Sequence, residues 1–118
     1  MTTRRRILVV DDEMLVAMML EDMLGDLDYD VVGPASTLDR ALDLANSETL
    51  DGAILDLNLG QGVVSTPIAQ LLNERGIPFL LATGYGASPQ TDALSHAGLL
   101  GKPFSFSDVE GALKTMLG

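Results

Sequence analysis

The chain has 118 residues, no cysteine, 47% hydrophobic residues and a formal net charge of −10. This length and composition predict one domain with an ordinary hydrophobic core, and they exclude a disulfide framework or wholesale disorder. The acidic excess argues against direct binding of nucleic acid, because that binding depends on Lys and Arg neutralising phosphates.

No apolar run is long enough to cross a membrane, and the short apolar run near the N-terminus ends in acids, unlike that of a signal peptide. We therefore expect a cytoplasmic protein without membrane insertion. The basic cluster Arg4, Arg5 and Arg6 is interpreted as a solvated start to the first strand rather than as a patch for a partner.

Short apolar segments alternate with amphipathic ones along the chain. The first, RILVVD, is almost entirely apolar and rich in β-branched residues, which predicts a strand buried on both faces. Apolar residues then recur every four positions over residues 13–27, which predicts a helix with one buried stripe. The members of this stripe are Leu15, Met19, Met23 and Leu27. Four of the six methionines lie in this helix, either as core filling or, alternatively, on a face that docks a partner.

The next two strands are predicted in YDVVGPAS and GAILDL. In the first of these, Gly33 and Pro34 indicate a sheet edge or a bulge. Between the two strands, Ser36 and Asp39 fit a capping box that opens a second helix. The third strand leads into the glycine-containing loop NLGQGVVS.

Thr66 and Pro67 fit the N-cap and the first position of a third helix, which would end near Gly76. The segments PFLLAT and AGLLGKPF predict a fourth strand and a short fifth strand, and Ser88 followed by Pro89 predicts a helix between them.

A capping box of Ser105 and Asp108 predicts the last helix, which would turn three apolar positions inward. Those positions are Val109, Leu113 and Met116 or Leu117.

Five strand–helix repeats with short connections predict an α/β domain with a parallel sheet and helices on both faces. In such sheets ligands bind at the carboxyl ends of the strands. Polar residues occupy four of these ends: Asp11, Asp12 and Glu13; Asp56 with Asn58; Thr83; and Lys102 with Pro103.

Carboxylates at this edge point to a divalent cation. Mg²⁺ prefers oxygen ligands and is usually held by one or two carboxylates. Asp11 or Asp12, or both, could supply that shell together with Asp56. A backbone carbonyl near Asn58 could complete it.

The residues predicted at this edge also indicate phosphoryl transfer. An aspartate can attack phosphorus and form an aspartyl phosphate, and Asp56 is the best nucleophile because it ends the middle strand. Lys102 would meet a phosphoryl oxygen as a point charge, and the hydroxyl of Thr83 would donate to another.

The motifs VVDDE, ILDLNLG, LLATG and GKPF, in this order and spacing, resemble the receiver domain of a two-component response regulator over essentially the whole chain. The resemblance implies a flavodoxin-like (βα)5 fold with a five-stranded parallel sheet in the order 2-1-3-4-5. It implies a signalling switch phosphorylated by a histidine kinase or histidine phosphotransfer protein with Mg²⁺ or Mn²⁺. Phosphorylation would change the face of the fourth strand, fourth helix and fifth strand for a downstream protein target. Self-catalysed phosphoryl transfer and autodephosphorylation would be its only chemistry, so it would not be an enzyme.

The resemblance also implies a role for each site residue. They are Asp56 as phosphoacceptor, Asp11 and Asp12 as the metal-binding pair, Asn58 as a main-chain metal ligand, Thr83 as the switch hydroxyl, Lys102 as the phosphoryl contact and Pro103 after a cis bond.

Two positions depart from the common receiver pattern. Leu99 stands where receivers usually carry an aromatic switch residue, and Tyr85 in ATGYG is the nearby aromatic residue that could replace it. This motif resembles the FAT GUY subgroup of receivers, with Leu81 in the place of the phenylalanine. The loop after Asp56 carries LGQG where many receivers have a proline.

No output domain follows residue 118, so we expect either a stand-alone receiver or part of a longer protein. Two other functions stay open. A phosphatase with an aspartate nucleophile would want a second aspartate where Asn58 stands, and it would need a substrate pocket. A degenerate receiver that only binds partners would not need the full set of Asp11, Asp12, Asp56, Thr83 and Lys102.

Overall fold

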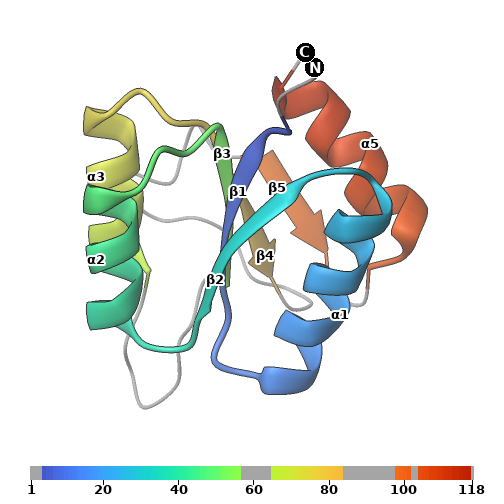
Figure 1. Ribbon diagram of the computed structural model, residues 1–118, viewed down its shortest axis with the longest axis horizontal. Helices are drawn as coiled ribbons and strands as arrows, with labels where there is room; N and C mark the ends of the chain where they lie inside the picture. The colour runs from blue at the N-terminus through green and yellow to red at the C-terminus, as the bar shows by residue number, and fades with distance from the viewer. Residues whose placement is uncertain (1–3, 57–64, 84–97, 102–103, 118) are drawn as a thin grey trace.

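A computed structural model describes residues 4–56, 65–83, 98–101 and 104–117 (Figure 1). Five parallel strands form one sheet in the order β2-β1-β3-β4-β5, as predicted. The strands are β1 (Arg6–Val10), β2 (Asp30–Ala35), β3 (Gly52–Asp56), β4 (Phe79–Thr83) and β5 (Gly98–Gly101). The described helices are α1 (Met14–Asp26), α2 (Leu38–Ser47), α3 (Thr66–Glu74) and α5 (Phe106–Leu117). The helix predicted after Ser88 falls outside the described residues.

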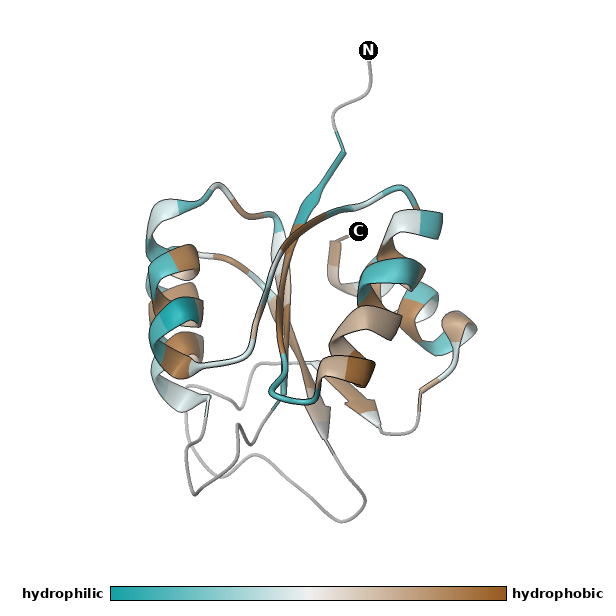
Figure 2. Cartoon of the chain, turned by 60° about the horizontal axis from the view of Figure 1, so that its bottom comes forward, coloured by the Kyte–Doolittle hydropathy of each residue, from teal (hydrophilic) through white to brown (hydrophobic). Residues whose placement is uncertain are grey.

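Helices cover both faces of the sheet, with α1 and α5 on one side and α2 and α3 on the other (Figure 1). Each side holds its own cluster of buried apolar residues. All five residues of β3 are buried, and so are the last four of β1. Strands enclosed on both faces explain why the central segments of the sequence are apolar without alternation. Figure 2 shows the resulting hydrophobic sheet between the helix layers.

The edge strand β2 contains the predicted bulge. Its register against β1 shifts between Leu8 and Val10. Gly33 sits there with φ +95°, and its peptide bond to Pro34 is cis. A Cβ added to Gly33 would lie 2.8 Å from the backbone nitrogen of Ala35, so this site accepts only glycine. The cis bond predicted before Pro103 falls outside the described residues.

The predicted buried stripe of α1 is wrong in its first half. Leu15 is 83% exposed and Met19 is 40% exposed, whereas Ala17, Leu20 and Leu24 face the core. Met23 and Leu27 are partly buried against the same cluster, so the latter half of the predicted stripe does pack inward. Four apolar side chains are left on the outer surface of α1, which we call the outer apolar face: Met14, Leu15, Met18 and Met19.

Two predicted helix starts are displaced by one residue. The hydroxyl of Thr37, not of Ser36, caps α2 by accepting a hydrogen bond from the backbone N–H of Arg40 at 3.2 Å. Ser65 rather than Thr66 is the N-cap of α3. These shifts leave the predicted elements and their order unchanged.

The predicted capping box of α5 is confirmed. The backbone N–H of Ser105 donates to Asp108 Oδ2 at 2.9 Å, and the N–H of Asp108 donates to Ser105 Oγ at 3.2 Å. Val109 and Leu113 are fully buried. This helix is therefore anchored at its start by hydrogen bonds and along its inner face by packing.

The N-terminal arginines fasten β1 to neighbouring elements instead of being merely solvated. Arg5 donates to the backbone oxygen of Leu117 at 2.8 Å, at the end of α5. Arg6 forms an ion pair with Glu48 at 3.0 Å, after α2. Arg4 pairs with Asp28 at 3.8 Å, and both Arg4 and Arg5 are exposed, so the solvated interpretation holds for these two and fails for the partly buried Arg6. In the part of the chain that the structure describes, no helix has the length and hydrophobicity needed to cross a membrane.

Candidate functional site

Asp11 directly follows the carboxyl end of β1 and is fixed there by burial and hydrogen bonds. Its side chain is almost completely buried, with 1% of the residue exposed. Its backbone N–H donates to the oxygen of Ala35 at 3.0 Å, which ties it to the end of β2. Asp11 Oδ1 accepts a hydrogen bond from the N–H of Glu13 at 2.8 Å. The carboxylate thus shapes the turn into α1 and still faces the edge of the sheet.

Asp56 is the last residue of β3 and lies beside Asp11. The pairing of Val10 with Leu55 places the two aspartates next to each other, one position beyond the paired residues. Asp56 is 7% exposed. Its backbone pairs with Ala82 of β4, so the carboxylate stands at the centre of the sheet edge, as the sequence predicts.

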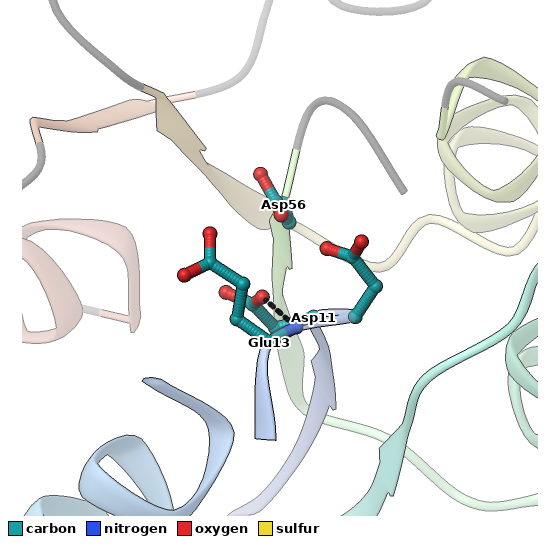
Figure 3. Close-up of side chains that lie close together, drawn as sticks. Asp11, Glu13 and Asp56 are labelled. Atoms are coloured by element: carbon teal, nitrogen blue, oxygen red, sulfur yellow. Dashed lines mark hydrogen bonds between the residues drawn. The ribbon is translucent and has the colours of Figure 1, made fainter. Parts of the chain in front are cut away.

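Four carboxylates converge at this edge: Asp11, Asp12, Glu13 and Asp56, each with an oxygen within 4.8 Å of the oxygens of the others. Figure 3 shows Asp11, Glu13 and Asp56 around the common space. Asp11 and Asp56 are buried, whereas Asp12 and Glu13 are exposed. Burial of the two like charges of Asp11 and Asp56 is costly unless a cation or hydrogen bonds compensate them. Hard divalent cations take such oxygen ligands. The donor set therefore fits Mg²⁺.

The backbone brings the predicted Thr83 to the same edge. Thr83 ends β4 one position after Ala82, the partner of Asp56. It pairs with Gly101 of β5, and Lys102 follows Gly101 in the sequence. The sheet register therefore places the backbone of Thr83 at the same edge as Asp56.

Asn58, Tyr85, Lys102 and Pro103 fall outside the described residues. Leu99, the residue in the usual position of the aromatic switch, lies on β5 and is 55% exposed. The side chain that was predicted to take part in the switch therefore faces solvent on the edge strand.

Glu13 is a member of the cluster that the sequence reasoning did not place among the metal-binding residues. It is the N-cap of α1, yet its side chain makes no capping hydrogen bond. The available signal was the uninterrupted run of acids from Asp11 to Glu13 at the end of a buried strand. Such a run places the third carboxylate at the helix start, within reach of the first two.

The model of the response regulator receiver domain matches residues 7–114. The chain belongs to this family. As a receiver domain, it acts in phosphorylation-dependent two-component signalling. The family, the strand order and the acidic edge agree with each other, because the receiver fold gathers its site at the carboxyl ends of β1 and β3.

Among solved structures, this receiver domain is similar to SdrG from Sphingomonas melonis Fr1, with 42% identity, a TM-score of 0.86 and full coverage of both chains. The beryllofluoride-activated conformation of SdrG matches with a TM-score of 0.81.

Curated relatives are more distant. The phyllosphere-induced regulator PhyR of Methylorubrum extorquens is 30% identical over 94% of this chain and 43% of its own length. The transcriptional regulatory protein PdtaR of Mycobacterium tuberculosis is 28% identical over 93% of this chain and 55% of its own length. The receiver domain thus spans about half the length of these relatives.

Proposed function

We propose that Asp56 is the phosphoacceptor of this receiver domain and that Asp11 and Asp12 hold the Mg²⁺ that its phosphorylation requires. The observation that carries this proposal is the convergence of these three carboxylates, with Glu13, within 4.8 Å at the carboxyl edge of the sheet. Asp56 ends the central strand, so a phosphoryl group on its oxygen would face solvent beyond the edge. Mn²⁺ would serve in place of Mg²⁺.

The remaining groups have the roles that the family resemblance implies. When bound, Mg²⁺ supplies charge neutralisation for the phosphoryl oxygens. The main chain of Asn58 completes the metal shell, Lys102 contacts the phosphoryl group, and Thr83 donates a hydrogen bond to it. The position of Thr83 at the end of β4, beside the strand of Asp56, supports this arrangement.

Phosphorylation then changes the surface to which partner proteins bind. A phosphoryl group adds between one and two negative charges at pH 7. Thr83 moves toward it, and Tyr85, in the place of the missing aromatic residue on β5, changes its packing. The face that includes β4 and β5 thereby alters for a downstream protein target. The exposure of Leu99 on β5 is consistent with a role of that strand in such a face.

The phosphodonor is a histidine kinase or a histidine phosphotransfer protein in the cytoplasm. The outer apolar face of α1 supports a docking position for it, because this face begins directly beside Asp12 and Glu13. Apolar side chains grouped on the surface mark contact sites for proteins. The first turns of α1 appear brown in Figure 2, next to the hydrophilic turn that carries the acids.

An intact-mass measurement tests the phosphoacceptor. The protein is incubated with acetyl phosphate and Mg²⁺, and wild type should gain one phosphoryl group. Asp56→Asn should gain none, and wild type in EDTA should gain none. Asp51→Asn is the matched control, because Asp51 is an exposed aspartate at the opposite end of β3. The proposal would be contradicted if wild type gained no mass and if beryllofluoride also left its backbone amide spectrum unchanged.

We further propose that the domain catalyses only its own phosphorylation and dephosphorylation. A phosphatase would release phosphate from a small phosphate ester over many turnovers, whereas this receiver would release only the phosphoryl group that Asp56 accepts from a phosphodonor such as acetyl phosphate. Steady release from p-nitrophenyl phosphate, lost in Asp56→Asn, would contradict this.

A further inference from the structure

Three methionine side chains lie exposed on the outer apolar face of α1. Met14 is 75% exposed, Met18 52% and Met19 40%. The two other methionines that the structure describes, Met23 and Met116, pack partly buried against the core. The chain has no cysteine, so methionine is its only side chain with an oxidisable sulfur. In the described part of the chain, the solvent-accessible methionines are therefore concentrated on one face of one helix.

The spacing of these residues joins them into one surface. Met14 and Met18 are four positions apart, as are Leu15 and Met19, and side chains four positions apart are neighbours on a helix. The first turns of α1 are accordingly brown in Figure 2. Apolar side chains grouped in this way mark a contact site for a protein. A chemical change at the three sulfurs would thus alter a whole contact surface.

Oxidation is the reaction open to an exposed thioether. Hydrogen peroxide transfers one oxygen atom to the sulfur, so that the O–O bond breaks, an S–O bond forms and water leaves. The sulfur loses the two electrons that the peroxide gains. The product, methionine sulfoxide, is polar where methionine is apolar, and sulfoxide reductases restore the thioether.

The charges around this face favour an uncharged oxidant. The helix α1 contains no lysine or arginine. Exposed acids flank the face at both ends, with Asp12 and Glu13 before it and Glu21 and Asp22 after it. These acids repel an anionic oxidant, whereas hydrogen peroxide approaches without this barrier.

We propose that Met14, Met18 and Met19 form an oxidation site for hydrogen peroxide, and that oxidation there controls how apolar the outer apolar face is. The reduced face docks a protein, and the oxidised face loses that capacity. The acidic edge contains no sulfur, so phosphorylation by a small donor persists in the oxidised protein. The consequence for docking rests on the proposed function, which places the phosphodonor on this face, but the oxidation itself does not.

The test treats the native protein with hydrogen peroxide and locates the added oxygen by peptide mass mapping. Each sulfoxide adds about 16 Da, and Met14 and Met18 should react at least about fivefold faster than Met23 and Met116, because reactivity follows exposure. Retention on a phenyl column then measures the apolar surface, and oxidised wild type should elute earlier. Its far-UV circular dichroism should stay unchanged, since the exposed side chains lie outside the core.

Two variants show whether the shift in retention comes from this face. The combined variant Met14→Leu, Met18→Leu and Met19→Leu keeps apolar side chains but has no thioether there, so peroxide should leave its retention unchanged. Met23→Leu is the matched control, because it removes a partly buried thioether of the same helix and should show the shift of wild type.

Three results would overturn the oxidation site. They are equal reaction rates at Met14, Met23 and Met116, an oxidised wild type that keeps its retention or loses its helical signal, and a leucine variant that shifts as far as wild type.

Acetyl phosphate distinguishes this inference from the proposed function. Oxidised wild type should gain one phosphoryl group with Mg²⁺, as untreated wild type does. If only the oxidised protein gained none, oxidation would act on the phosphorylation site, and this inference would fail. If the untreated protein gained none, the proposed function would fail, while the peptide map and the retention would still decide the oxidation site.

Discussion

Gly33 is a single residue on which the shape of strand β2 depends. Its φ of +95° is rarely adopted by residues with a side chain, and a Cβ would also approach the oxygen of Val9 to 3.2 Å. The left-handed conformation alone costs an L-residue about 1–2 kcal/mol. Because the two closest contacts of the added Cβ are with backbone atoms, a rotamer change cannot relieve them.

We therefore expect Gly33→Ala to lower the free energy of unfolding by about 2 kcal/mol or more, measured by urea denaturation. Gly111→Ala is the matched control, since Gly111 lies inside α5 with nothing within 4 Å of an added Cβ. That variant should gain about 0.5–1 kcal/mol from helix propensity. A Gly33→Ala protein as stable as wild type would show that β2 can straighten without cost.

Single residues of the site differed in how well the sequence predicted them. Asp11 and Asp56 follow buried strands, and parallel strands bring their carboxyl ends together, so their proximity could be derived. The run of acids placed Glu13 within reach of them, but whether its carboxylate joins the cluster depends on the direction of its side chain, which makes no capping hydrogen bond. The sequence shows that residue 13 carries a carboxylate, but it does not show where that side chain points.

At the level of the helix, α1 shows why periodicity alone can choose the wrong face. Its first seven residues, MLVAMML, are all apolar, so spacings of four connect residues on any side of the helix. The stripe through Leu15 and Met19 fits the pattern as well as the one through Leu20 and Leu24. The choice is made by packing against the sheet. By contrast, the strands themselves followed from their apolar runs, and their order in the sheet followed from the family resemblance.

The helices α2 and α3 are joined by a side chain that no local pattern predicts. Arg75, at the C-terminal end of α3, donates to the backbone oxygens of Ala45 and Glu48 at the end of α2. The last carbonyls of a helix have no partner within the helix, and a cation also suits the negative end of its dipole. Arg75 thus caps a helix other than its own.

Replacing Arg75 by methionine should lower the free energy of unfolding by about 1–2 kcal/mol, because it removes two charge-assisted hydrogen bonds but keeps an apolar stem. Arg40→Met provides the control, because Arg40 is an exposed arginine of α2 whose bond to Thr37 uses only its backbone. Guanidinium chloride is unsuitable as a denaturant here since it screens charge, so urea is used. Equal stabilities of the two variants would contradict the capping role.

Across the whole molecule, a net charge of −10 makes the native state sensitive to cations in two separable ways. Any salt screens the general repulsion of the surface acids. A divalent cation that binds only the native cluster adds a mass-action term, which reaches about 1.4 kcal/mol at ten times its dissociation constant. For a domain of this size that term raises Tm by about 5 °C.

Thermal unfolding in MgCl₂ and in NaCl of equal ionic strength separates these two effects. Wild type should unfold about 5 °C higher in MgCl₂ at ten times the dissociation constant, because only Mg²⁺ occupies the cluster. Asp12→Asn should lose most of this difference, since Asp12 contributes an exposed oxygen to the cluster. Asp22→Asn removes the same charge from the surface elsewhere and should keep the difference. Identical unfolding of wild type in the two salts would mean that the four carboxylates respond to ionic strength alone, and that their convergence does not create a cation site.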